Sequence, residues 1–158
     1  MENVMNLYIL RHAHAVDAAE DPERPLSARG RSQVRDLAVF LKRNNALVTR
    51  EIWHSPLARS GETAGLLIKK LGIKAKLVET GGLQPEDDPQ LLAQRLKARQ
   101  QPLAIVGHDP QLSALVSLLV TGATEPSRFI LKKCTIIALE RTEGVWTVRW
   151  QLSPELLT

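Results

Sequence analysis

The feature that most constrains the fold is a regular alternation of short apolar runs with longer segments of helical periodicity. Four short apolar runs predict buried strands, at residues 7–10, 51–55, 75–79 and 103–108. Four segments with apolar residues at helical spacing predict helices, at residues 27–43, 59–71, 89–99 and 110–120. Such alternation is typical of an α/β protein whose parallel or mixed sheet carries helices on both faces.

The last apolar run, over residues 134–152, predicts a hairpin that turns near Glu143 and Gly144. With 158 residues, the chain is long enough for one proper hydrophobic core. The predicted fold is therefore an α/β single-domain three-layer sandwich over residues 1–158. Its central sheet is mostly parallel, helices cover both faces, and the hairpin ends the chain.

The composition is that of an ordinary globular protein, with 44% hydrophobic and 24% charged residues. A formal net charge of +4 favours attraction to anions, such as phosphate groups, acidic proteins or nucleic acid. Aromatic residues make up only 4% of the chain, too few for a platform on which single-stranded nucleic acid could stack. No nucleic-acid partner is therefore expected.

The single cysteine, Cys134, excludes an internal disulfide and is typical of a reducing compartment. It lies in the apolar run CTIIAL, where a small core residue is expected rather than a reactive thiol. No apolar run approaches the roughly 18 residues that a membrane-spanning helix requires. We therefore expect a cytoplasmic protein with no membrane partner, and a monomer as the default.

Polar residues follow three of the predicted strands at the points where these strands end. Arg11-His12 follows the first strand, His54-Ser55 ends the second, and Gly107-His108 ends the fourth. In open α/β sheets, ligands bind beyond the carboxyl ends of the strands. The sequence therefore predicts one functional site at this edge of the sheet.

A metal centre is one interpretation of the histidines. His12 and His14 form an H-x-H pair, and His54, His108 and Asp109 could complete a site for zinc. However, hydrolases with this pair usually need a barrel of about 250 residues. Two arginines also adjoin the proposed ligands, and a site for a dication should not gather guanidinium groups. No metal and no other cofactor is therefore predicted.

A phosphoryl group suits the same residues better. Arg11 and Arg59 each offer a planar fork of donors that matches two phosphate oxygens. A neutral imidazole can attack phosphorus and carry the phosphoryl group covalently. The predicted helices near Arg59 and Pro110 add N-terminal backbone N–H groups and positive dipole ends. Phosphoryl transfer needs little beyond such positioning and charge stabilisation.

The chain contains four motifs, which follow one another along the sequence. They are LRHA after the first predicted strand, PLSARGRSQ at the first predicted helix, HSPLARSGETA after the second strand and VGHDP after the fourth. Together they resemble the histidine phosphatase superfamily, once called phosphoglycerate-mutase-like, over nearly the whole chain. The short length, Ala13 and the GHDP motif resemble its SixA-type phosphohistidine phosphatase branch.

This resemblance implies a role for each matching residue. His12 would be the nucleophile that becomes transiently phosphorylated, and Arg11 and Arg59 would clamp the phosphoryl oxygens. His108 would donate to the same group and stabilise its transition state. Ser55 would support the pocket.

Three further residues are assigned to substrate binding. Lys132 and Lys133 either face the mouth of the pocket and attract acidic proteins, or form a solvated pair. His14 is expected to make a peripheral contact at the pocket rim, or none. His54 is expected to be a packed or exposed polar residue.

Two features depart from the superfamily pattern. Many members carry glycine where this chain has Ala13, and a positive φ there would strain alanine. Relatives that act on oxygen esters use a later carboxylate as general acid. The candidates for that role lie in or next to a short acidic loop and are Glu79, Glu86, Asp87 and Asp88. A solvated turn is the simpler interpretation of this loop.

The predicted function is that of a metal-independent phosphatase acting on phosphohistidine in a signalling protein of a phosphorelay or phosphotransfer system. The imidazole leaving group of phosphohistidine, with a free pKa of about 6.5, demands little proton donation from the enzyme. Two alternatives stay open. One is a small-molecule phosphomonoesterase, with a small phosphorylated substrate, and the other is a phosphohistidine-binding module without catalysis.

Overall fold

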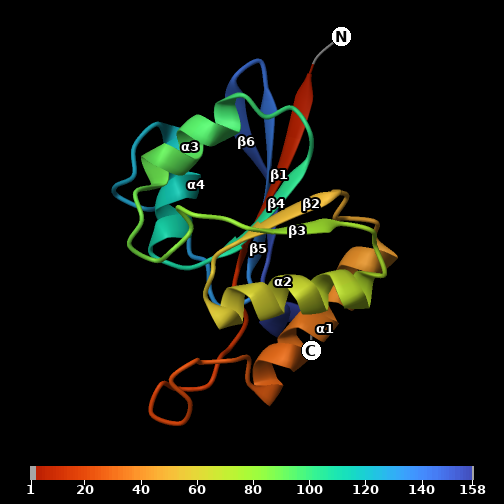
Figure 1. The fold of residues 1–158 in the computed structure, drawn as a ribbon. Coiled ribbons are helices and arrows are strands. Elements are labelled where there is room, and N and C mark those ends of the chain that lie inside the picture. Colours follow the sequence, from red (N-terminus) through yellow and green to blue (C-terminus); the bar gives the residue numbers. More distant parts are fainter. Residues whose placement is uncertain (1–2, 158) are drawn as a thin grey trace.

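The computed structural model describes residues 3–157 and contains a six-stranded sheet (Figure 1). The strands are β1 (Val4–Arg11), β2 (Glu51–His54), β3 (Lys76–Glu79), β4 (Leu103–Gly107), β5 (Ile136–Thr142) and β6 (Val145–Leu152). Their order in the sheet is β3-β2-β4-β1-β5-β6. The first four strands pair in parallel, while β5 pairs antiparallel with both β1 and β6. This arrangement confirms the predicted fold class.

Helices cover both faces of this sheet. They are α1 (Ala28–Arg43), α2 (Ala58–Leu71), α3 (Pro89–Lys97) and α4 (Gln111–Thr121), followed by the 3-10 helix η1 (Pro154–Leu157). The pair α1 and α2 lies on one face and the pair α3 and α4 on the other (Figure 1). The short helix η1 packs beside α1 and was not predicted.

The alternation of side chains along β1 divides the core into two layers. Tyr8 and Leu10 pack toward α1 and α2, whereas Leu7 and Ile9 pack toward α3 and α4. All four side chains are buried. Each of the three aliphatic side chains among them contributes about 1.5–3 kcal/mol by leaving water. A strand buried on both faces explains why its sequence is a continuous apolar run.

Local signals place most element ends within two residues of their predicted positions. Ser27 is the N-cap of α1, and its Oγ accepts a hydrogen bond from the Gly30 N–H at 3.0 Å. The hairpin turns at Glu143 and Gly144, whose φ values are 50° and 77°. A two-residue turn whose twist matches that of the two flanking strands requires such positive φ values. The helix predicted to reach residue 99 ends at Lys97 instead. There the Arg141 guanidinium, from β5, donates to the carbonyl of Leu96 at 2.7 Å.

Across residues 3–157, no helix has both the length and the apolar character that crossing a lipid bilayer would need.

Candidate active site

The site lies where β1, β4 and β2 end side by side. Arg11 is the register partner of Gly107, and the His12 N–H donates to the Gly107 carbonyl at 2.9 Å. His12 and His108 directly follow these two residues, and they are therefore neighbours at the ends of β1 and β4. The rings of His12 and His108 lie 5.0 Å apart between centroids, and both side chains are buried.

Backbone contacts fix the tautomer of His12. Its Nδ1 lies 2.7 Å from the Ala13 carbonyl oxygen, which can only accept, so Nδ1 carries the proton. The lone pair is then on Nε2. Burial lowers the pKa of His12, the hydrogen bond to Ala13 opposes this shift, and the electrostatic effects of His108, Arg59 and Arg11 add to it, which together bring the pKa to about 3. His12 is thus a neutral imidazole at physiological pH with a free Nε2, as a nucleophile must be.

Ser55 contacts one ring nitrogen of His108. The Ser55 Oγ lies 2.6 Å from His108 Nε2 and accepts a hydrogen bond from the Leu57 N–H at 3.3 Å. When this hydroxyl donates its proton to Nε2, the proton of neutral His108 lies on Nδ1. Burial, followed by the charges of Arg59 and Arg11, lowers the pKa of His108 to about 4. The neutral ring then presents Nδ1–H as a donor.

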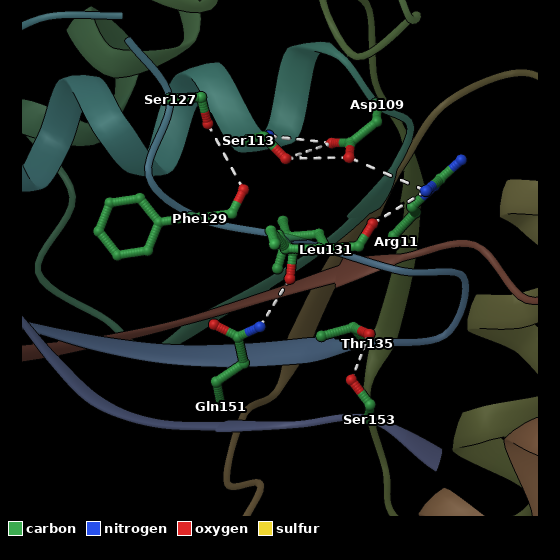
Figure 2. A network of polar contacts seen from close by, with 10 residues as sticks. Arg11, Asp109, Ser113, Ser127, Phe129, Leu131, Thr135, Gln151 and Ser153 are labelled. Atoms are coloured by element: carbon green, nitrogen blue, oxygen red, sulfur yellow. Dashed lines mark hydrogen bonds and ion pairs between the residues drawn. The ribbon is translucent and has the colours of Figure 1, made fainter. Parts of the chain in front are cut away.

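Two guanidinium groups approach the histidines. Arg11 Nη1 donates to the Leu131 carbonyl at 2.9 Å and lies 3.9 Å from an Asp109 carboxylate oxygen (Figure 2). Ser113 holds that carboxylate through its Oγ and its backbone N–H. Arg59 lies in the first turn of α2, and burial together with the charge of Arg24 lowers its pKa.

Three buried side-chain nitrogen atoms in this cluster have no hydrogen-bond partner within residues 3–157. They are Arg11 Nε, Arg59 Nε and His108 Nδ1. A buried polar group without a partner costs about 1–3 kcal/mol, so such groups are rare unless a ligand satisfies them. Two guanidinium groups and one imidazole N–H around a neutral imidazole suit a tetrahedral oxyanion.

The loop that carries the candidate nucleophile is held by two residues that the sequence analysis missed. The Ala13 N–H donates to Thr63 Oγ1 at 3.0 Å, and Thr63 Oγ1 donates to the Arg59 carbonyl at 2.7 Å. Thr63 therefore ties the His12 loop to the helix of Arg59. Thr63 lies inside the HSPLARSGETA motif, and this position is the sequence feature from which its role could have been predicted.

Cys134 is the second missed residue. Its backbone N–H donates to the carbonyls of Arg11 at 3.1 Å and His12 at 3.0 Å, and its φ of 61° is left-handed. The predicted burial of its side chain is confirmed, and burial raises the pKa of the thiol to about 12. Because the contacts depend on the backbone of Cys134, no side-chain motif could predict them.

Ala13 is not strained at its position. It is fully buried, and it is absent from the non-glycine residues with positive φ among those described. A methyl group is therefore compatible with this loop, and glycine is not required for its backbone conformation.

The structure brings five of the predicted site residues into one cluster, and the other three lie beside it. Arg11, His12, Ser55, Arg59 and His108 form the cluster described above. The remaining predicted residues line a neighbouring cavity of about 620 Å³ and are His14, Lys132 and Lys133. Lys132 also lines a second hollow together with Arg11, and burial followed by the charge of Arg11 lowers the pKa of Lys133.

His14 does not join His12. Its Nδ1 lies 2.6 Å from the Ser27 Oγ, and its N–H donates to Gln33 Oε1. Lys132 is exposed and forms an ion pair with Glu155 at 3.1 Å. His54 is half-buried, with Nδ1 2.9 Å from the Ser55 carbonyl oxygen, which agrees with its expected packing role.

The acidic loop has local structural roles. Asp87 Oδ2 accepts a hydrogen bond from the Gln84 N–H, and Asp88 Oδ1 caps α3 by accepting from the Gln90 N–H, both at 2.9 Å. Glu79 is exposed at the end of β3. Between residues 3 and 157, no cluster of three or more His, Cys, Asp or Glu side chains could hold a metal ion.

The lowered pKa values of His12 and His108 predict that acid destabilises the fold. In the unfolded chain both histidines take up protons near pH 6.5, whereas in the folded chain they stay neutral to about pH 4. Stability is therefore complete above about pH 6.5. It falls as the pH is lowered below that value, by about 2 kcal/mol per histidine down to about pH 5. Urea unfolding between about pH 8 and 5 measures this. The double variant His12→Asn/His108→Asn should lose most of the slope, and an unchanged slope would contradict the assignment.

Comparisons with known proteins agree with this geometry. The model of the histidine phosphatase superfamily (branch 1) matches residues 7–84. Phosphohistidine phosphatase SixA of Escherichia coli (strain K12) is 29% identical over 155 residues, which cover 95% of this chain and 94% of that protein. An uncharacterized protein of Picosynechococcus sp. is 32% identical over 143 residues, covering 85% of this chain and 84% of that protein.

The solved structures include the protein histidine phosphatase SixA complexed with tungstate. It matches with a TM-score of 0.85 and 28% identity, over 98% of this chain and 100% of that chain. The similarity thus extends over the whole sheet and both helical layers, including the strand ends that carry the site. The chain belongs to the histidine phosphatase superfamily, in its SixA-type branch, and is a phosphatase.

Proposed function

We propose that this phosphatase hydrolyses phosphohistidine on a signalling protein, through a covalent phosphoryl intermediate on His12. The observation that carries the proposal is the buried, neutral His12 with a free Nε2, surrounded by three buried donors that lack partners. The similarity to SixA, solved with the oxyanion tungstate, supports the same substrate class.

In the first step, His12 Nε2 attacks the phosphorus atom while the bond from phosphorus to the substrate imidazole breaks. The substrate nitrogen leaves with the bonding electron pair, and the departing imidazole is neutral because its other ring nitrogen already carries a proton. In this proposal, Arg11 Nε, Arg59 Nε and His108 Nδ1–H, which are buried and have no partner within the described residues, donate to the three phosphoryl oxygens, where charge is spread in the transition state. The Nδ1–H of His12 stays bonded to the Ala13 carbonyl and stabilises the positive charge that forms on the ring.

In the second step, water attacks phosphorus and the bond to His12 Nε2 breaks. The oxygen of the water joins the phosphoryl group, its proton passes to a phosphate oxygen or to solvent, and inorganic phosphate leaves. His12 returns to its neutral form. The same three donors serve both steps because the phosphoryl oxygens stay in one place.

Ser55 acts in this scheme as a positioning residue. Its hydroxyl holds the Nε2 of His108, so that Nδ1 keeps its proton and faces the phosphoryl group as a donor. With the other tautomer, a bare Nδ1 lone pair would face an oxyanion and repel it.

Leaving-group chemistry favours phosphohistidine over oxygen esters. An alkoxide needs a general acid, whereas two of the candidate carboxylates, Asp87 and Asp88, are bonded to the loop and the N-terminus of α3. Imidazole needs little protonation by the enzyme. A small-molecule phosphomonoesterase is therefore the second candidate. The unstrained Ala13 removes one ground for a module that binds without catalysis.

Relative rates on three substrates test the proposal. We expect a higher kcat/KM for a phosphohistidine protein or peptide than for a sugar phosphate, with an aryl phosphate in between, measured as release of inorganic phosphate. A higher kcat/KM for the sugar phosphate would favour the second candidate. Binding of phosphohistidine without release of phosphate would establish a binding module.

A further inference from the structure

A large hollow adjoins the phosphoryl site on the side of Arg11. It has a volume of about 970 Å³ and lies between the loop 85–90 and the segment 124–132. Arg11 and Asp109 line it, so it is continuous with the guanidinium group that faces the phosphoryl position. A phosphoryl group fills only a small part of such a volume, which is large enough for a drug-sized ligand. We call it the acidic hollow.

The acidic hollow has an excess of negative charge in a chain whose net charge is +4. Five carboxylates line it, against two cations. The carboxylates belong to Glu86, Asp87, Asp88, Asp109 and Glu125, and the cations are Arg11 and Lys132. Both cations are already in ion pairs, Arg11 with Asp109 and Lys132 with Glu155.

Two of these carboxylates form no contact with the described residues that would stabilise the fold. Glu86 and Glu125 lie on opposite walls, both are exposed, and neither forms an ion pair or side-chain hydrogen bond with another described residue. Gln111 also lines the hollow, is 2% exposed, and its Oε1 accepts no hydrogen bond from residues 3–157. The lining therefore offers acceptors and negative charge, which match a ligand that supplies N–H donors and positive charge.

One wall of the hollow also offers an apolar contact. Ile130 is 74% exposed there, between Phe129 and Leu131. The backbone of this wall is fixed, because Gln151 Nε2 donates to the Ile130 carbonyl at 2.7 Å and Arg11 holds the Leu131 carbonyl (Figure 2). An exposed aliphatic side chain on a fixed backbone suits contact with a polypeptide better than with a small ion.

We propose that the acidic hollow binds the polypeptide beside the phosphorylated histidine of the substrate, and selects substrates with a lysine or arginine next to that histidine. This inference rests on the proposed phosphohistidine activity and adds the charge of the flanking sequence. The hollow would repel substrates with further anionic groups on this side of the phosphoryl position.

The test uses two phosphohistidine peptides that differ only in the residues next to the histidine, lysine in one and glutamate in the other. At low ionic strength the wild type should prefer the lysine peptide by about five- to tenfold in kcat/KM, and added salt should reduce the preference. The double variant Glu86→Gln/Glu125→Gln should lose most of it. Glu143→Gln, an exposed carboxylate in the turn between β5 and β6, is the matched control and should keep it.

Equal kcat/KM for the two peptides in the wild type would overturn the inference, as would an unchanged preference in the double variant. Turnover of an aryl phosphate reports on the intact catalytic site in every variant. If the wild type hydrolyses the aryl phosphate but neither peptide, the proposed phosphohistidine activity fails and this inference fails with it. Hydrolysis of both peptides at equal rates refutes the charge selection alone.

Discussion

His12→Asn is expected to lower turnover by about a thousandfold or more, because no other group within reach replaces the Nε2 lone pair. Asparagine can still donate an amide N–H to the Ala13 carbonyl, so the loop should stay in place. The measurement is the initial rate of phosphate release from an aryl phosphate and from a phosphohistidine protein. Both rates should fall together.

Urea unfolding near neutral pH provides the control for His12→Asn. The free energy of unfolding should stay within about 1–2 kcal/mol of the wild-type value, since the substitution removes a buried neutral ring and keeps one hydrogen bond. A folded variant with more than a few per cent of wild-type activity would contradict the assignment of His12 as nucleophile.

Arg59→Lys is expected to lower kcat/KM by about a hundredfold or more. Lysine keeps the positive charge but lacks the planar fork and the buried, unpartnered Nε that we propose binds the phosphoryl group. Most of the loss should appear in kcat, because the donors act on charge that develops in the transition state. Steady-state kinetics on an aryl phosphate separate kcat from KM.

Arg50→Lys is the matched control for Arg59→Lys. Arg50 is exposed and directly precedes β2, at the end of the strand opposite the site. Its conversion to lysine should leave kcat and KM unchanged. Equal behaviour of the two variants would mean that bidentate recognition by Arg59 does not contribute to catalysis.

The layered fold was predictable because its strands are buried on both faces. The run that contains Leu7 and Ile9 has no polar alternation, as expected for a strand covered by helices on both sides. The helix that follows Ser27 had both a cap and a periodic apolar face. Ends set by distant side chains, such as the end of α3 at Lys97 near Arg141, carried no local signal.

The candidate site was predictable where its residues follow strand ends, because topology brings such positions together. Arg11, His12 and His108 are of this kind. The alternation of side chains along a strand could not predict the position of His14, because β1 already ends at Arg11. Beyond that end, the side chain of His14 contacts Ser27. Contacts between the backbone and distant residues, such as those of Cys134, also have no local signal.

The acidic hollow could not be predicted from the sequence. Glu86 belongs to a loop before α3, and Glu125 to the connection between α4 and β5. As separate stretches of sequence, each is an ordinary solvated turn. Only the packing of the two segments around Arg11 places their carboxylates on one hollow beside the candidate active site.

The most direct test of the account is to trap the phosphoryl group on the enzyme. The wild type is mixed rapidly with a radiolabelled phosphohistidine protein, quenched in alkali at increasing times, and the labelled peptide is identified. The account predicts transient, acid-labile label on His12, at no more than one phosphoryl group per chain, and no label in His12→Asn. Full turnover with label on another residue, or with no label on the enzyme at any time, would contradict it.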